Sequence, residues 1–181
     1  MIIINAASLQ DLFAETPEEK ERWERQKRRK QIKEQKVSEP YKLSLYSGIK
    51  SLDPNNLPET FVLDPNKSEQ KLLWFTHIFI RGYNPVEYAK GHGDVLLTYQ
   101  LDCKRHYKIV EYDDGTKEER QDEETAAKAE PTENSKFMTL IPYTIELPDG
   151  WWFTYKNEKF IGCSIPLTIT KDMLSPSEIP E

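Results

Sequence analysis

Residues 95–112 read VLLTYQLDCKRHYKIVEY and carry the clearest secondary-structure signal in the chain. From Leu97 to Ile109 every second residue is apolar or aromatic, except Arg105, and the residues between them are polar or charged. Side chains of a β-strand point alternately to opposite faces of a sheet. The stretch therefore predicts a long strand with one face on a core and the other in solvent, bent or bulged near its middle.

Shorter stretches on both sides also predict strands. Residues 72–80 (LLWFTHIFI) are apolar at almost every position, which is typical of a strand buried on both faces. Tyr41 to Leu45 alternate and could add an edge strand. Further strands are expected at residues 137–147, 151–156 and 159–170. Turn signals at Asp113-Asp114-Gly115 and Pro148-Asp149-Gly150 separate some of these stretches.

These strands predict a mainly β fold, either a small antiparallel β-sandwich or a partly open barrel, preceded by a long charged N-terminal helix. The pattern of strands does not separate sandwich from barrel. The expected organisation is an N-terminal extension (1–38), a β-rich domain (39–174) with an acidic loop or partial helix (113–134), and a flexible polar tail (175–181).

The helix is expected from about residue 16 to residue 36. Thr16 can cap it, Pro17 suits its first position, and Glu19 completes a capping box. Only Trp23 and Ile32 are large and apolar, so the helix has no apolar stripe with which to join a core. On a helix, five cations share one arc of about 140°; they are Arg25, Arg28, Arg29, Lys33 and Lys36.

The charges of the chain are unevenly distributed along it. The formal net charge is -6, yet residues 25–36 hold seven Lys and Arg against one Glu, while residues 111–133 hold ten Asp and Glu against three Lys and Arg. The basic block suits an electrostatic contact with phosphates or an acidic protein surface. It also suits a solvated helix whose charges follow the helix dipole, with acids first and bases last.

Composition narrows the classes of function. The start of the chain is not typical of a signal peptide, and no stretch approaches the length of an apolar membrane span, so we expect a cytoplasmic protein or a component of a particle assembled in the cytoplasm. Cys103 and Cys163 fall on predicted inward faces and suit small core residues. No metal-ligand spacing, calcium loop, cofactor motif or nucleophile motif is present, so no metal, no cofactor and no catalytic residue is predicted.

The three histidines are candidates for a catalytic role. His77 lies in the most apolar stretch, as a core histidine would, and His106 is expected to face solvent. His92 lies in Gly91-His92-Gly93-Asp94, which could serve a hydrolase but also makes a good turn between strands. The turn is favoured, and the hydrolase stays the third hypothesis.

The leading hypothesis is a non-catalytic assembly or interaction protein. It docks into a larger complex, such as a viral or mobile-element particle, through the five cations and Trp152, with protein partners or its own copies. The alternative is a module for single-stranded nucleic acid with an OB-like barrel and a basic helix. There Trp152 would stack on bases beside Lys104, His106, Lys108 and Lys156.

Overall fold

The computed structural model describes residues 16–77, 82–129, 134–154 and 160–177, and these fall into two compact units. Unit 1 comprises residues up to Gln35 together with Ile109–Glu118, and unit 2 comprises Lys36–Lys108 together with residues from Glu119 onward. The helices are α2 (Pro17–Arg28), α3 (Pro85–Lys90), α4 (Glu123–Ala126) and the 3-10 turns η1 (Pro65–Lys67), η2 (Ala127–Ala129) and η3 (Lys171–Met173).

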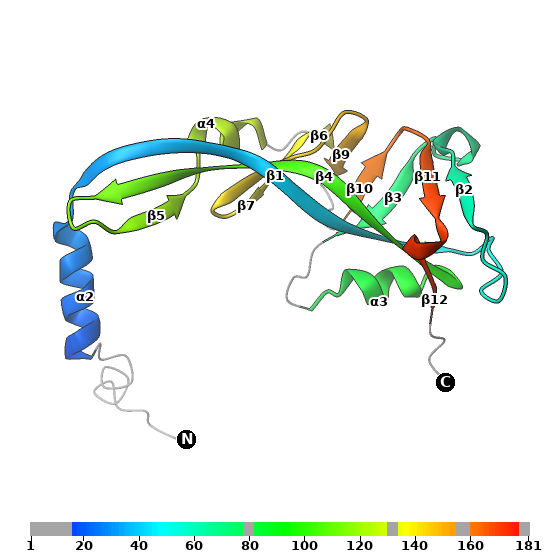
Figure 1. Ribbon diagram of the computed structural model, residues 1–181, viewed down its shortest axis with the longest axis horizontal. Coiled ribbons are helices and arrows are strands. Elements are labelled where there is room, and N and C mark those ends of the chain that lie inside the picture. The colour runs from blue at the N-terminus through cyan, green and yellow to red at the C-terminus, as the bar shows by residue number, and fades with distance from the viewer. Residues whose placement is uncertain (1–15, 78–81, 130–133, 155–159, 178–181) are drawn as a thin grey trace, which may run out of the picture. The chain divides into compact units, whose positions relative to one another are not determined.

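The remaining regular structure is β, as the sequence predicts (Figure 1). The strands are β1 (Gln31–Ile49), β2 (Thr60–Leu63), β3 (Leu73–Thr76), β4 (Val95–Tyr112), β5 (Lys117–Arg120), β6 (Asn134–Ser135), β7 (Phe137–Leu140), β8 (Tyr143–Glu146), β9 (Trp151–Thr154), β10 (Phe160–Cys163), β11 (Leu167–Thr170) and β12 (Leu174–Pro176).

Unit 2 is built on a nearly closed, antiparallel, barrel-like sheet. Neighbouring strands in this sheet follow the order β6-β9-β10-β3-β1-β4-β8-β7. Two further strands, β12 and β5, each pair with β4 outside this order. The chain passes from β6 into β7 with one residue between them, which brings the two ends of this order together. Of the β-sandwich and the partly open barrel that the sequence left open, the chain therefore adopts the barrel-like form.

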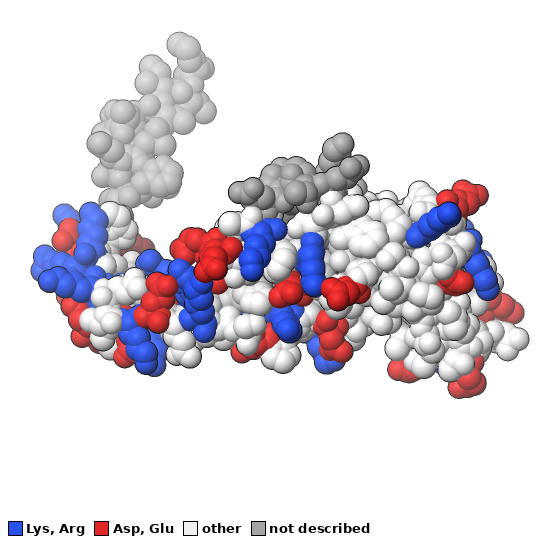
Figure 2. Space-filling model, turned by 90° about the horizontal axis from the view of Figure 1, so that it is seen from above, with Lys and Arg blue, Asp and Glu red and all other residues white. Residues whose placement is uncertain are grey.

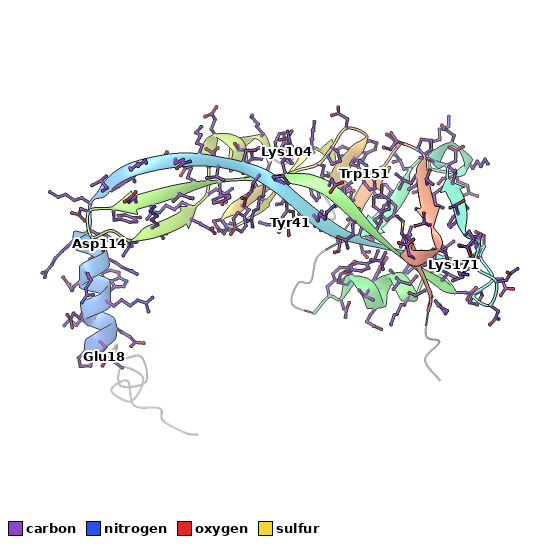
Figure 3. The ribbon with its side chains drawn as sticks, in the orientation of Figure 1. Glu18, Tyr41, Lys104, Asp114, Trp151 and Lys171 are labelled. Atoms are coloured by element: carbon purple, nitrogen blue, oxygen red, sulfur yellow. The ribbon has the colours of Figure 1, made fainter. Side chains whose placement is uncertain are left out.

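The core of unit 2 is formed by the inward-facing residues of these strands. Leu45, Leu97, Ile145 and Ile161 are fully buried, and both Cys103 and Cys163 are buried with free thiols, as predicted. Aromatic rings fill the centre: the ring of Trp151, labelled in Figure 3, lies 5.4 Å from that of Phe75 and 5.7 Å from that of Tyr99, measured between centroids. Burial of this apolar surface is the main source of stability.

Two strand predictions are wrong in detail. Residues 159–170 do not form one strand, because β10 belongs to the large sheet whereas β11 pairs with β2 in a separate two-stranded sheet. Pro166 lies between them and has no N–H with which to continue a ladder. Tyr41–Leu45 is not an edge strand, since it lies within β1, which runs between β3 and β4.

The other local predictions have mixed outcomes. The turns at Gly115 and Gly150 are confirmed, and both glycines take positive φ values of 80° and 86°. Within the acidic stretch 113–134, α4 and η2 form the partial helix expected as the alternative to a loop, whereas the strand β5 was not expected. Residues 78–80, the end of the predicted strand 72–80, lie outside the described residues, as do the last four residues of the predicted tail.

Replacement of Ile145 by Ala tests the assignment of the core. Ile145 is fully buried, whereas Ile141, in the same hairpin, is 86% exposed. Removing the buried side chain leaves a cavity, so Ile145→Ala should lower the free energy of unfolding by about 2–5 kcal/mol. Urea denaturation measures this change. The control, Ile141→Ala, should unfold close to the wild type, and equal losses in the two variants would contradict the described core.

Candidate functional site

The charged helix α2 forms for reasons present in its own sequence. The Thr16 hydroxyl accepts a hydrogen bond from the Glu19 N–H (3.1 Å), and the Glu19 carboxylate accepts one from the Thr16 N–H (2.8 Å). This is the predicted capping box, and Pro17 follows the cap. None of the twelve residues of α2 is buried, and Trp23 is 51% exposed with the Lys27 ammonium 3.5 Å from the centre of its ring.

The helix ends eight residues earlier than predicted, at Arg28. Arg29 turns to an extended conformation, lies over the ring of Tyr112 at 3.8 Å, and forms an ion pair with Glu118 at 2.8 Å. The next residue, Lys30, exchanges hydrogen bonds with Asp113, whose N–H donates to the Lys30 carbonyl. All these residues belong to unit 1. The residues after Arg28 have no apolar stripe, so a longer helix would bury little apolar surface and gain little stability. Pairing of β1 with β4 therefore determines their conformation.

The predicted face of five cations on one helix therefore does not exist. Arg25 and Arg28 lie on α2 and pair loosely with Glu21 and Glu24, at 3.4 and 3.5 Å. Arg29 caps the helix, Lys33 lies exposed on β1, and Lys36 belongs to unit 2. Lys33 and Lys36 lie in an extended strand, so the helical repeat that would align them with Arg25 and Arg28 does not apply to them.

The described part of unit 1 is also electrically balanced. Its described residues, 16–35 and 109–118, include nine Lys and Arg and nine Asp and Glu. The cation-rich stretch that stands out in the sequence is thus accompanied in space by acidic residues of α2 and of the β4–β5 hairpin. The positive charges of residues 25–35, which the sequence suggested would contact a partner, are therefore largely balanced by acidic residues of the same unit.

Several charged side chains of unit 2 are matched in the same way. Lys36 forms ion pairs with Glu124 and, at 3.7 Å, with Asp122, while the Lys108 ammonium lies 2.6 Å from Glu123. These contacts attach α4 to β1 and β4. On the face shown in Figure 2, blue and red side chains are interspersed instead of forming a field of one sign.

The side chains proposed to contact nucleic acid have different environments. His106 does not face solvent freely as expected, since its Nε2 lies 2.7 Å from Glu146 and its side chain is 17% exposed. Lys108 is engaged by Glu123. Lys104, labelled in Figure 3, is exposed on β4, and Lys156 lies outside the described residues. Paired cations contribute less to phosphate binding, so this surface offers little, and nucleic-acid binding stays a prediction.

Trp152 is not the solvent-exposed platform that strand alternation suggests. It is half-buried on β9 opposite Gly162 of β10, and its Nε1 lies 3.0 Å from the position that a Cβ on Gly162 would occupy. Trp74 of β3 pairs with the same glycine from the other side. The absence of a side chain at Gly162 leaves room for both indoles, which explains why Trp152 lies against the sheet.

His92 belongs to an aromatic cluster that sequence reasoning missed. Its ring stacks on Tyr88 with centroids 4.4 Å apart, and Tyr88 meets Phe160 edge-on at 5.5 Å. His92 Nδ1 lies 2.8 Å from the Tyr88 carbonyl. The cluster depends on α3, whose start is written in the sequence: Asn84 accepts hydrogen bonds from two N–H groups of the first turn, and Pro85 follows it.

These contacts place His92 against aromatic rings. Among the described residues that line the groove beside His92, none is Asp, Glu, Lys or Arg. The Gly93 and Asp94 carbonyls accept hydrogen bonds from Ser177, which gives the predicted turn a structural role. His77 is buried and meets the ring of Phe153, as expected of a histidine within the core.

Within the described part of the chain, no group of His, Cys, Asp and Glu side chains is arranged to hold a metal ion. Among its helices, none combines the length and the apolar character needed to cross a membrane. No protein-family model matches the sequence, and neither curated proteins nor solved structures gave a significant match. The functional argument therefore rests on the geometry of this chain.

The attachment of α4 generates a prediction about Asp122. Burial alone would raise the pKa of this carboxyl, but the Thr125 hydrogen bond and the charges of Lys36 and Lys108 outweigh it, so the pKa lies below its usual value. A lowered pKa adds stability above the unfolded-state value, about 3.9, and that stability is lost as the pH falls through the folded-state value.

Replacing Asp122 by Asn should therefore destabilise the protein at pH 7 by about 1–2 kcal/mol, because a charge-assisted hydrogen bond, the ion pair with Lys36 and the attraction of the Lys108 charge are lost. Urea denaturation at pH 7 and pH 3 measures the difference, which should shrink at pH 3. The matched control is Glu124→Gln, at an exposed site on the same helix, where the loss should be smaller. A pH-independent difference would contradict the role given to the Asp122 charge.

Proposed function

We propose that this chain is a non-catalytic assembly or interaction protein that docks into a larger complex through α2. The observation that carries the proposal is a well-capped helix of twelve residues with no buried residue. Isolated helices of this length are marginal in water, because stability in proteins comes from packing one face. A surface supplied by a partner would provide the packing that the described residues do not give α2.

The exposed face of α2 indicates what that partner should offer. Trp23 lies between Lys20 and Lys27, at three and four residues' spacing, so the three share one side of the helix. Indole is a common anchor in protein interfaces, and the flanking ammonium groups favour an acidic rim. The partner surface is therefore an apolar pocket bordered by carboxylates, on another protein or on a second copy. Trp23 takes the anchor role that the sequence suggested for Trp152.

The test compares the full chain with Trp23→Ala and with the double variant Lys20→Glu, Lys27→Glu. Affinity capture from the source cells, quantified by mass spectrometry, should recover a partner with the wild type and lose at least about tenfold of it with either variant. Light scattering of the purified chain detects self-association in the same series. Arg25→Ala is the matched control, because Arg25 lies on the opposite side of α2.

A second measurement follows from the marginal stability of an unpacked helix. Amide hydrogen exchange within α2 should be fast in the purified chain and slower once the captured partner is added. The proposal fails if capture and self-association are the same in wild type and Trp23→Ala, or if α2 is unprotected in the complex.

A further inference from the structure

Residues 121–128 form a strap across the outer face of the large sheet in unit 2. The strap includes α4 and the start of η2. It crosses β1, β4, β8 and β7, which are neighbours in the sheet, and makes a side-chain contact with each of them. These contacts join Glu124 to Lys36 of β1, Glu123 to Lys108 of β4, Gln121 to Thr144 of β8 and Lys128 to Phe137 of β7.

The start of the strap is held more firmly than α4. Asp122 is buried, and the Gln121 amide donates a hydrogen bond of 2.6 Å to the hydroxyl of the fully buried Thr144. In contrast, none of the four residues of α4 is buried, and the side chains of Glu123 and Glu124 are 75% exposed. One helical turn is unstable by itself, and exposed ion pairs contribute little free energy and are screened by salt. α4 should therefore open locally at a lower free energy than the sheet beneath it.

The sheet face next to α4 carries a line of basic side chains. The pKa of Lys36 lies above its usual value because Lys36 donates a hydrogen bond to Glu124, while the nearby charge of Lys108 acts in the opposite direction. Along β4, Lys108 is followed on the same face by His106 and by Lys104, at intervals of about 6.7 Å, because alternate residues of a strand share a face. Opening of α4 removes carboxylates from one end of this line and makes it more positive.

The same face carries an aromatic ring. The register of β4, β8 and β7 places Phe137 in one row with Lys104, and the ring of Phe137 lies 6.5 Å from that of His106. The Lys128 ammonium of the strap lies 5.7 Å from the centre of the Phe137 ring. Single-stranded nucleic acid is bound by this combination, because cations follow its phosphates and aromatic rings stack on its bases. An acidic peptide would supply anions but no planar group for Phe137.

We propose that this face binds single-stranded nucleic acid and that the strap is its internal cover. In the closed form, the carboxylates of Glu123 and Glu124 occupy the places of two phosphates, and Lys128 occupies the place of a base on Phe137. Only molecules in which α4 has opened bind tightly, so the cover lowers the apparent affinity. The site lies in unit 2 and does not involve α2. Phe137 takes the stacking role that the sequence suggested for Trp152.

The test weakens the cover and leaves the face intact. The double variant Glu123→Gln, Glu124→Gln should bind fluorescein-labelled (dT)10 about fivefold more tightly than the wild type, since loss of two ion pairs raises the open fraction. Fluorescence anisotropy at 50 and 200 mM NaCl measures the affinity, which should fall at the higher salt concentration. In the double-variant background, Phe137→Ala should weaken binding at least about fivefold, and Lys108→Ala should reduce the salt dependence.

The matched control has the same change of net charge outside the strap. Glu69→Gln with Glu87→Gln removes two exposed carboxylates from other parts of unit 2 and should bind (dT)10 like the wild type. Trp23→Ala should also bind like the wild type, which separates this site from docking through α2. In the wild type, amide exchange in α4 should be faster than in β4 and should accelerate with salt.

The single-stranded RNA (U)10 is titrated in parallel, and salt-sensitive binding of either polymer to the double variant supports the site. Three results would each overturn the proposal: no salt-sensitive binding of either polymer, an equal gain in the charge-matched control, or tighter binding of a ten-residue polyglutamate peptide than of both polymers.

Discussion

The two-residue repeat of side chains along β4 is the constraint on which the rest of unit 2 depends. β4 is bordered by β1 along one edge and by β12 and β8 along the other, so its register fixes theirs. Because successive residues point to opposite faces, a slip of one residue would bring Asp102 and Lys104 to the core and expose Leu101 and Cys103. The cost of burying those charges selects one register. The same choice places Asp102 outside, where it pairs with Lys42 at 2.6 Å.

Alternation also explains how far the sequence could predict this fold. It identified β4 with its observed bounds, because one face of the strand is buried over much of its length. It failed between β10 and β11, since Ile161 and Cys163 face the core from one sheet and Leu167 and Ile169 face it from another. An apolar–polar pattern reports which residues are buried, not which sheet buries them. The short helix α3 was not predicted, because six residues are too few to show a helical repeat of apolar side chains. Its capping sequence was the only signal.

The N-terminal segment shows a second limit, set by contacts between distant residues. Every local feature of residues 29–36 is compatible with the helix that precedes them. The outcome is decided by hydrogen bonds between Lys30 and Asp113 and by the contacts of Arg29 with Tyr112 and Glu118, which join positions more than eighty residues apart. Such pairing stabilises the strand, and the helical tendency of a polar segment is too weak to compete. The predicted cationic face depended on those residues, and of its five cations only Arg25 and Arg28 lie on α2.

The charged residues that are conspicuous in the sequence largely form ion pairs in the structure. The residues of α2 that recognise a partner are therefore better sought among its uncharged side chains. Exposed ion pairs of the kind seen between Arg25 and Glu21, or between Lys42 and Asp102, contribute little free energy each and are screened by salt. A surface of such pairs is hydrated and offers little to a specific partner. Specificity requires groups whose burial is favourable, and on the otherwise polar helix α2 that group is Trp23, which is 51% exposed. Trp23 interrupts the charge pattern of α2, so this neutral residue carries a stronger functional argument than the paired charges around it.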